Sequence, residues 1–349
     1  MLQSRGADAA LVTDPVNVCY LTGLASSNAA CLVTADGITA LATDSRYAEA
    51  AARLDDDLET VTDRATAAVL LQRVHAPARV AVEHQRVTVA VMSALRESVQ
   101  DGVDLVDLDE AVEELRGDKD VAEVALVAQA CAISDAALRG LLTGKVRGRT
   151  ERELARDLEV RMLRLDADGL AFATIVAAGP HGSVPHHAPT DRPVEAGDLL
   201  TIDFGAQVGG YHADCTRTVA VGRAPDDWQR EVHAVVAAAQ QAGIDALAPG
   251  TATADVDRAA RAVIEESGHG PSFVHGLGHG VGLQIHERPW LSNASGLADR
   301  LPNRSTLTVE PGIYLPGRGG VRIEDTIAVG SDGVHVLTAT SKALLVVDE

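Results

Sequence analysis

A glycine-rich stretch between residues 275 and 286 carries three histidines, His275, His279 and His286. Neutral imidazole is the commonest side-chain metal ligand in proteins. Glycine allows the backbone to approach a small ligand or an ion closely. A histidine cluster alone indicates little about function. Its significance depends on the carboxylates that precede and follow it in the sequence.

Two aspartates lie in predicted strands joined by a pair of glycines. Asp203 belongs to the run 199–206, and Asp214 belongs to the run 211–221. A hairpin of these strands would bring the two carboxylates side by side. Asp is depleted in strand interiors, and buried neighbouring carboxylates repel each other unless a cation binds them. The alternative is that one aspartate lies at a strand end, in contact with water.

Two glutamates follow in comparable settings. Glu310 ends an apolar run and precedes a Pro-Gly pair. Glu324 lies in the predicted strand 321–329, with Arg322 two positions earlier on the same face. The alternative is an exposed Arg322–Glu324 ion pair of small energetic value. Oxygen ligands with one imidazole suit Mn²⁺, Co²⁺, Fe²⁺ or Zn²⁺, and several carboxylates match the bridging that two ions about 3.5–4 Å apart require.

Composition restricts the class of protein. The chain has 349 residues, of which 46% are hydrophobic and 23% are charged, as in a globular protein of about two domains. A net charge of −20 without a basic run argues against nucleic acid or anionic membranes as partners. Four scattered cysteines without a Cys-x-x-Cys motif favour a reducing compartment, the cytoplasm. We expect neither a secretory signal nor a membrane helix, because no suitable apolar run is evident.

Residues 1–115 alternate strand and helix patterns, which predicts a small α/β domain. We expect strands at 9–13, 29–34, 38–42, 79–83 and 103–107, and helices at 44–54 and 89–99. A polar segment then precedes a long helical pattern that ends near Leu142. We therefore place the second domain at residues 116–349.

The second domain is predicted to be α+β, with helices packed on an antiparallel sheet. Thr150 and Glu153 form a capping-box pattern that begins a helix reaching about residue 165. Further helices are expected at 226–247 and 254–267. The strands are expected at 171–177, 199–206, 211–221, 306–311 and 321–329.

These motifs resemble the aminopeptidase P/prolidase branch of the metallopeptidases, which has the creatinase or pita-bread fold. Each motif is moderately specific, but their joint order along the chain is highly specific. The pattern Asp44-Ser-Arg-Tyr47 also resembles the N-terminal domain of this branch. The motifs of the second domain are Phe172-Ala-Thr-Ile-Val, Val184-Pro-His186-His, Leu200-Thr-Ile-Asp203-Phe-Gly, Asp214-Cys-Thr-Arg-Thr, His275-Gly-Leu-Gly-His279-Gly, Ile285-His286-Glu, Val309-Glu310-Pro-Gly and Arg322-Ile-Glu324-Asp.

The resemblance implies two divalent ions, most commonly Mn²⁺, with Co²⁺ or Zn²⁺ as alternatives. It implies attack on the peptide by a metal-bridging hydroxide, with Glu310 as ligand and proton acceptor. His186 and His286 would stabilise the oxyanion, His275 would shape the pocket, and Arg322 would orient a ligand carboxylate. The alternative for each histidine is a hydrogen-bonded structural role, which we expect most for His187 and least for His279. A homodimer is also implied, in which the partner's N-terminal domain closes the cleft. The implied metal ligands are Asp203, Asp214, His279, Glu310 and Glu324.

The implied substrate is a peptide with proline in second position. Some prolidases carry an arginine four residues after the histidine that corresponds to His286. This chain has Trp290 there, with Arg288 nearby. Loss of a bidentate carboxylate partner favours longer substrates, so we expect an Xaa-Pro aminopeptidase, with an Xaa-Pro dipeptidase as the alternative.

Two other classes are less well supported. Non-enzymatic binding proteins with this fold lack some metal ligands, whereas this chain keeps the complete set. A nicotinamide oxidoreductase is disfavoured because Val281 or Leu283 occupies the third glycine position of a Gly-x-Gly-x-x-Gly motif.

Overall fold

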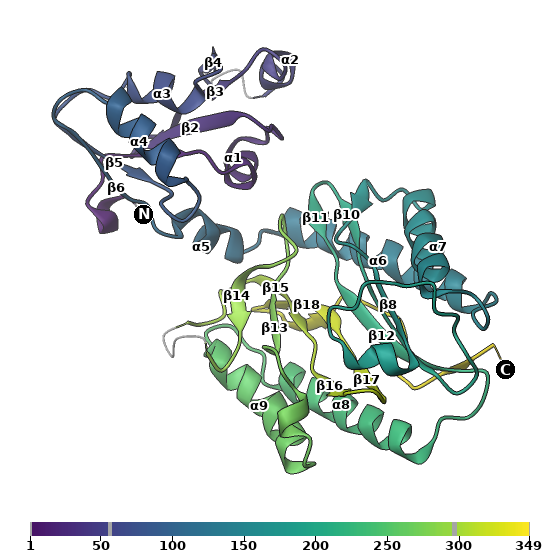
Figure 1. Cartoon of the computed structure of the whole chain (residues 1–349). Helices are drawn as coiled ribbons and strands as arrows, with labels where there is room; N and C mark the ends of the chain where they lie inside the picture. Colours follow the sequence, from purple (N-terminus) through teal and green to yellow (C-terminus); the bar gives the residue numbers. More distant parts are fainter. Residues whose placement is uncertain (1, 55–57, 295–298, 349) are drawn as a thin grey trace. The chain divides into compact units, whose positions relative to one another are not determined.

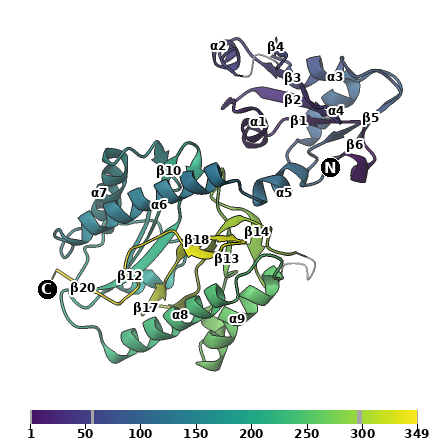
Figure 2. The same cartoon turned by 180° about the vertical axis from the view of Figure 1, so that it is seen from behind.

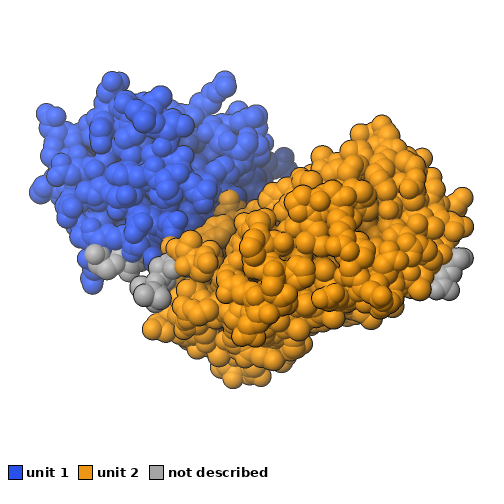
Figure 3. Space-filling model, turned by 60° about the horizontal axis from the view of Figure 1, so that its bottom comes forward, with its two compact units in different colours: residues 1–116 blue, residues 117–349 orange. Residues whose placement is uncertain are grey.

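The computed structural model describes residues 2–54, 58–294 and 299–348. The chain folds into two compact units, Met1–Arg116 and Gly117–Glu349, which Figure 3 shows in blue and orange.

The first unit is built on a six-stranded mixed sheet in the order β4-β3-β2-β1-β5-β6 (Figure 1). Alternate residues of β1 pack into two different hydrophobic cores. Ala10 and Val12 belong to one core, and Ala9 and Leu11 belong to the other. Helices therefore cover both faces, and the α/β prediction is confirmed. The strands are β1 (Ala9–Val12), β2 (Ala29–Thr34), β3 (Gly37–Thr43), β4 (Thr60–Thr62), β5 (Ala78–Val82) and β6 (Val103–Asp107). The helices are α1 (Pro15–Thr22), α2 (Ala48–Ala51), α3 (Thr66–Leu71), α4 (Val89–Ser98) and α5 (Ala111–Gly117).

The predicted helix at 44–54 is wrong for its first residues, since α2 begins only at Ala48. The Asp44 carboxylate accepts a hydrogen bond from the backbone N–H of Arg46 at 3.0 Å. Asp often forms such a turn with the backbone two residues ahead, and the turn competes with helix formation.

Two pairs of helices frame the second unit. The first pair is α6 (Val121–Leu142) and α7 (Glu151–Arg164), which share one hydrophobic core with the first half of the strands (Figures 1 and 2). The second pair is α8 (Asp227–Asp245) and α9 (Thr253–Glu266), which share another core with the second half of the strands. The predicted capping box is present at the start of α7, where the Thr150 hydroxyl accepts the Glu153 N–H. This arrangement confirms the predicted α+β class.

Helix α6 is long and apolar enough to cross a membrane, which corrects our expectation that no run has this character. Half of the segment is buried within the protein. Val127, Ala130 and Leu138 belong to the core that α6 shares with α7. A helix that is apolar on most sides is typical of the core of a globular unit as well as of a membrane span.

The strands between the helix pairs form two main sheets, in the orders β20-β12-β9-β8 and β14-β13-β15-β18-β19. Two smaller sheets, β11-β10-β7 and β16-β17, complete the unit. The strands are β7 (Gly169–Leu170), β8 (Ile175–Ala178), β9 (Leu199–Phe204), β10 (Ala206–Val208), β11 (Tyr211–His212), β12 (Cys215–Val221), β13 (Gly278–Gly280), β14 (Glu287–Leu291), β15 (Ser305–Val309), β16 (Gly312–Leu315), β17 (Gly319–Arg322), β18 (Asp325–Gly330), β19 (Gly333–Val336) and β20 (Val346–Val347).

Several predicted strands are interrupted in the structure. The run 199–206 divides at Gly205, where an added Cβ would lie 1.8 Å from the carbonyl oxygen of Ala213. The run 211–221 divides at Ala213 and Asp214, and the run 321–329 divides at Ile323 and Glu324. The predicted strand 171–177 is wrong for residues 171–174, which are irregular. Breaks of this kind free side chains at the ends of strands to converge on one site.

Candidate metal centre and active site

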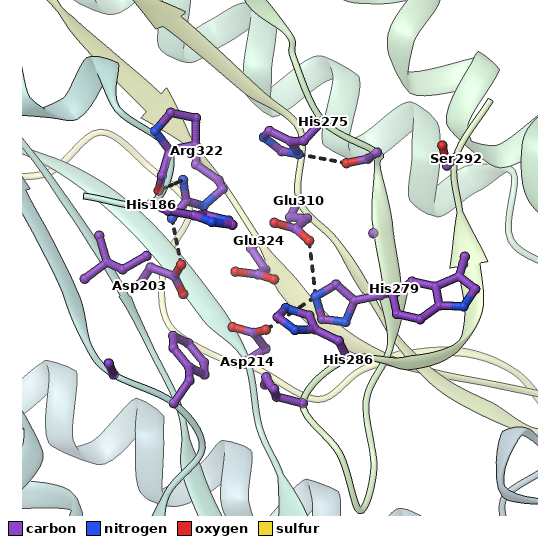
Figure 4. A pocket seen from close by; sticks show the side chains of 18 of the residues that line it. His186, Asp203, Asp214, His275, His279, His286, Ser292, Glu310, Arg322 and Glu324 are labelled. Carbon is purple, nitrogen blue, oxygen red and sulfur yellow. Dashed lines mark hydrogen bonds and ion pairs between the residues drawn. The ribbon is translucent and has the colours of Figure 1, made fainter. Parts of the chain in front are cut away.

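A cavity of about 490 Å³ lies within the second unit, and every predicted site residue lines it (Figure 4). The residues come from strand ends and loops that are far apart in the sequence. They are His186, Asp203, Asp214, His275, His279, His286, Glu310, Arg322 and Glu324.

Four carboxylates converge at the base of this cavity. Figure 4 shows them turned toward one another, with His279 and Arg322 on opposite sides. Burial, followed by repulsion from the neighbouring carboxylates, raises the pKa of Asp214 and of Glu324 well above the ordinary values. Burial also raises the pKa of Asp203, although Arg322 opposes this effect. The cluster therefore holds more negative charge than its own protein surroundings can stabilise.

His279 lies beside two of the carboxylates. Its Nε2 atom is 3.3 Å from Glu310 and 3.7 Å from Asp214. Its Nδ1 atom lies 3.1 Å from the carbonyl oxygen of Gly280, a contact that leaves Nε2 facing the cluster. Burial opposes ionisation of both partners, but their mutual attraction raises the pKa of His279 and lowers that of Glu310 to about 2.

The glycines next to His279 allow neighbouring backbones to approach closely. A Cβ at Gly278 would lie 2.1 Å from the carbonyl oxygen of Thr308, and one at Gly280 would lie 2.0 Å from that of Arg288. These glycines therefore permit the neighbouring strands to approach β13. The expected close approach of the backbone to a ligand stays a prediction.

The donor set fits divalent metal ions. Ligand atoms of Asp214, His279 and Glu324 all lie within 4.8 Å of one another. One oxygen of Asp203 and one of Glu324 are buried without a hydrogen-bond partner. Buried carboxylate oxygens are costly when left unpaired, and a bound cation would satisfy them. Carboxylate oxygens with one imidazole nitrogen are typical ligands of Mn²⁺, Co²⁺ and Zn²⁺.

Arg322 is a buried residue that hydrogen-bonds to three side chains at the site. It donates to Asp203 at 2.7 Å, to the Tyr314 hydroxyl at 2.9 Å and to the Thr216 hydroxyl at 3.0 Å. The Thr216 hydroxyl in turn donates to Glu324 at 2.6 Å. Arg322 and Glu324 are only 3% and 1% exposed, so the alternative of a surface ion pair is excluded.

The remaining histidines differ in how they are held. His275 Nε2 lies 2.9 Å from the Tyr314 hydroxyl, within hydrogen-bond distance. His186 and His286 are exposed to the cavity, and neither ring hydrogen-bonds to any described residue. The His286 ring meets that of His279 edge to face, with 4.4 Å between centroids. Two imidazoles are thus free to bind a ligand above the carboxylate cluster.

Comparison with known proteins places the chain in a family. The sequence model that describes metallopeptidase family M24 matches residues 125–331. The sequence model that describes the creatinase/prolidase N-terminal domain matches residues 1–117. The chain belongs to metallopeptidase family M24. This result also confirms the expected pita-bread fold.

Three relatives illustrate the similarity. The Xaa-Pro dipeptidase of Pyrococcus furiosus is 40% identical over 238 residues, which are 68% of each chain. The structure of an Xaa-Pro dipeptidase from Bacillus anthracis matches with a TM-score of 0.91 and 32% identity over 99% of this chain and 97% of that one. The structure of an X-Pro aminopeptidase from Thermotoga maritima matches with a TM-score of 0.87 and 33% identity over 99% of both chains.

Tyr314 is a site residue of this M24 peptidase to which our reading of the sequence gave no role. It lines the cavity and joins Arg322 to His275 through one hydroxyl. Burial raises its pKa to about 12, so it stays protonated. Its position four residues after Glu310, in the run Glu310-Pro-Gly-Ile-Tyr, was the only signal in the sequence.

A second group with the composition of a metal site lies outside the lining of the cavity. Glu151, His181 and His187 offer ligand atoms within 4.8 Å of one another. The Glu151 carboxylate already accepts bonds from the N–H groups of Ala178 and Thr190, the Thr190 hydroxyl and both imidazoles. Although burial opposes it, these donors lower the pKa of Glu151 to about 2. The contact with Glu151 supports the structural role expected for His187.

Proposed function

We propose that this M24 peptidase hydrolyses Xaa-Pro bonds with the help of two divalent metal ions, for which Mn²⁺ is the first candidate and Co²⁺ or Zn²⁺ are alternatives. The observation that carries the proposal is the convergence of four carboxylates and His279 in one cavity, with unpaired oxygens on Asp203 and Glu324. The implied ligands are Asp203, Asp214, His279, Glu310 and Glu324. When bound, such ions supply a water of lowered pKa and polarise a carbonyl group.

The chain's own residues would then orient the peptide and move protons. Glu310 lines the cavity beside His279, and its ionised carboxylate would accept a proton from the attacking water. His186 and His286 are free to donate hydrogen bonds to the carbonyl oxygen as it gains negative charge. Arg322 fixes the orientation of Asp203 through their contact of 2.7 Å. His275 shapes the pocket through its contact with Tyr314.

For substrate length, we propose an Xaa-Pro dipeptidase as the first candidate. This revises the sequence-based preference for an aminopeptidase, which depended on Trp290 alone. The Pyrococcus and Bacillus relatives both carry the name Xaa-Pro dipeptidase. An Xaa-Pro aminopeptidase is the second candidate, and the cavity lining favours it. Trp290 lines the cavity whereas Arg288 does not, so Arg322 is the only Arg or Lys among the described lining residues.

The two candidates are separated by substrate length. We would strip the protein with a chelator, add Mn²⁺, Co²⁺ or Zn²⁺, and measure release of the first residue from Xaa-Pro and Xaa-Pro-Xaa peptides. A dipeptidase gives the larger kcat/KM on Xaa-Pro, and an aminopeptidase gives it on the longer peptide. Absence of cleavage of either peptide with every metal would refute the Xaa-Pro proposal.

Replacing His286 by Ala should lower kcat by roughly 10²–10³-fold, the usual effect of removing one oxyanion donor. Metal content should not change, because His286 is not among the proposed ligands. The control is His335→Ala, since His335 is an exposed residue on β19 whose side chain is 55% exposed. Unchanged kinetics in the His286 variant would remove this residue from the catalytic group.

We propose that the protein acts on peptides in the cytoplasm and has no nucleic-acid or membrane partner. Its acidic surface and four unpaired cysteines agree with this. The homodimer stays a prediction, which the mass in solution by light scattering would test.

A further inference from the structure

The loop between β13 and β14 carries two cavity residues, Ile285 and His286. The His286 ring makes no hydrogen bond to a described residue, so its position depends on its ring contact with His279 and on the backbone on either side of it. The residue that follows it, Glu287, points into the protein and is 4% exposed.

Glu287 is held by a cation from a distant part of the chain. Its Oε1 atom accepts a hydrogen bond from Lys119 Nζ at 2.7 Å, and the two side chains are only 3% and 1% exposed. Its Oε2 atom accepts the backbone N–H of Gln284 at 3.2 Å, which closes the loop on itself. One carboxylate thus joins the loop that carries His286 to the segment that precedes α6.

The loop is packed tightly onto this ion pair. A Cβ at Gly282 would lie 2.3 Å from Glu287 Oε1 and 2.8 Å from Lys119 Cε, so only glycine fits without displacing the pair. The carbonyl oxygen of Gly282 accepts the backbone N–H of His212 at 2.9 Å and lies 2.8 Å from its Nδ1. Because a carbonyl oxygen only accepts, the contact with His212 is a hydrogen bond when Nδ1 carries the proton. Contacts of Gly282 with His212 and of Glu287 with Lys119 therefore fix both ends of the loop.

The energetics of buried ion pairs indicate why this arrangement matters. Removing two charges from water is costly, and apolar replacements of a buried pair are often neutral or stabilising. Stability alone therefore does not account for Lys119 and Glu287. Such a pair can instead hold one geometry, because separating two buried opposite charges is costly.

We propose that the buried Lys119–Glu287 pair positions His286 over the carboxylate cluster for catalysis. This inference rests on the proposed function, since His286 matters only if a carbonyl group is attacked there. Lys119 and Glu287 are positioning residues, because neither lines the cavity.

The test is the double variant Lys119→Met with Glu287→Gln, which removes both charges and keeps the side-chain lengths. We expect kcat for the preferred Xaa-Pro peptide to fall by about 10²-fold, the cost of a misplacement of about 1 Å. KM and bound metal should change little, and Tm should stay the same or rise. Amide exchange measured by mass spectrometry should accelerate in residues 281–288 and not in α7.

A matched control is Arg149→Met with Asp157→Asn, a pair at 2.9 Å whose side chains are 27% exposed and lie away from the cavity. It should leave kcat unchanged. The positioning role is overturned if the first double variant keeps its kcat, or if kcat falls only together with Tm and metal content. If the wild-type protein cleaves no Xaa-Pro peptide, the proposed function fails. Exchange in 281–288 then still decides whether the pair fixes the loop.

Discussion

Replacing Asp214 by Asn is expected to lower kcat/KM for Xaa-Pro peptides by roughly 10³-fold or more, which corresponds to about 4 kcal/mol. Asp214 is 5% exposed and lies among Asp203, Glu324 and His279, where we propose that it binds metal. Asn keeps the shape of the side chain but loses the charge. The variant should therefore bind fewer than two metal ions per chain, as measured by elemental analysis.

The same substitution should stabilise the metal-free protein at neutral pH. Burial and the carboxylates around it raise the pKa of Asp214 well above its ordinary value, so its ionised form is unfavourable without a cation. Removing that charge relieves repulsion with Glu324 and Asp203. A higher Tm after chelation, combined with lost activity, distinguishes a metal ligand from a residue needed for folding.

Asp227→Asn is the matched control, because that side chain is 99% exposed. It should change neither metal content nor turnover. Full activity with two bound ions in the Asp214 variant would contradict the proposed ligand set.

Much of the proposed site could be predicted because its chemistry is local in the sequence. An aspartate in an apolar strand and a histidine between glycines are unusual in their immediate surroundings, whatever the rest of the fold. The relative positions of the site residues and the breaks in their strands were harder to predict. The register pairs Asp203 with Thr216 of β12, so Asp214 lies two residues before Thr216, in the break that precedes β12, and not directly opposite Asp203. The strand break at Gly205 depends on its contact with Ala213, which no local pattern reveals.

Most partners of the supporting residues could not be predicted, because they are distant in the sequence. For Arg322 the role of orienting a ligand carboxylate was predicted, but not which carboxylate it contacts. Lys119 and Glu287 are separated by 168 positions, and Arg322 and Asp203 by 119. Lys119 belongs to no motif, and Glu287 enters one only as the residue that follows His286, with no role assigned to it. Short strands such as β13 and β14 were also missed, because glycine and proline are depleted in strands and obscure their pattern. Tertiary contacts determine these features.

Removing the metal ions should destabilise the protein, and more strongly at pH 8 than at pH 5. The pKa values of Asp203, Asp214 and Glu324 are all raised in the folded, metal-free protein, first by burial. A carboxyl group of this kind binds its proton more tightly when folded. Its contribution to the free energy of unfolding is complete below the unfolded pKa of about 4 and is lost as pH rises toward the folded value.

The other two proposed ligands do not reverse this direction. The pKa of Glu310 is lowered to about 2, so its contribution is present above pH 4 and is lost only as pH falls toward 2. The pKa of His279 is raised, so its contribution is also lost as pH rises above the unfolded value of about 6.5. The apo-protein should therefore lose stability steadily from pH 5 to pH 8.

Bound metal replaces the missing protons, and the loaded protein should not show this loss. At a free metal concentration a thousandfold above Kd, binding adds about 4 kcal/mol to the free energy of unfolding. Urea unfolding of the second unit, followed with and without chelator at several pH values, measures the difference. The Asp214→Asn protein should show a shallower pH dependence after chelation, because one of the three raised groups is absent. Parallel curves for the apo and loaded wild-type proteins would show that these carboxylates do not bind metal.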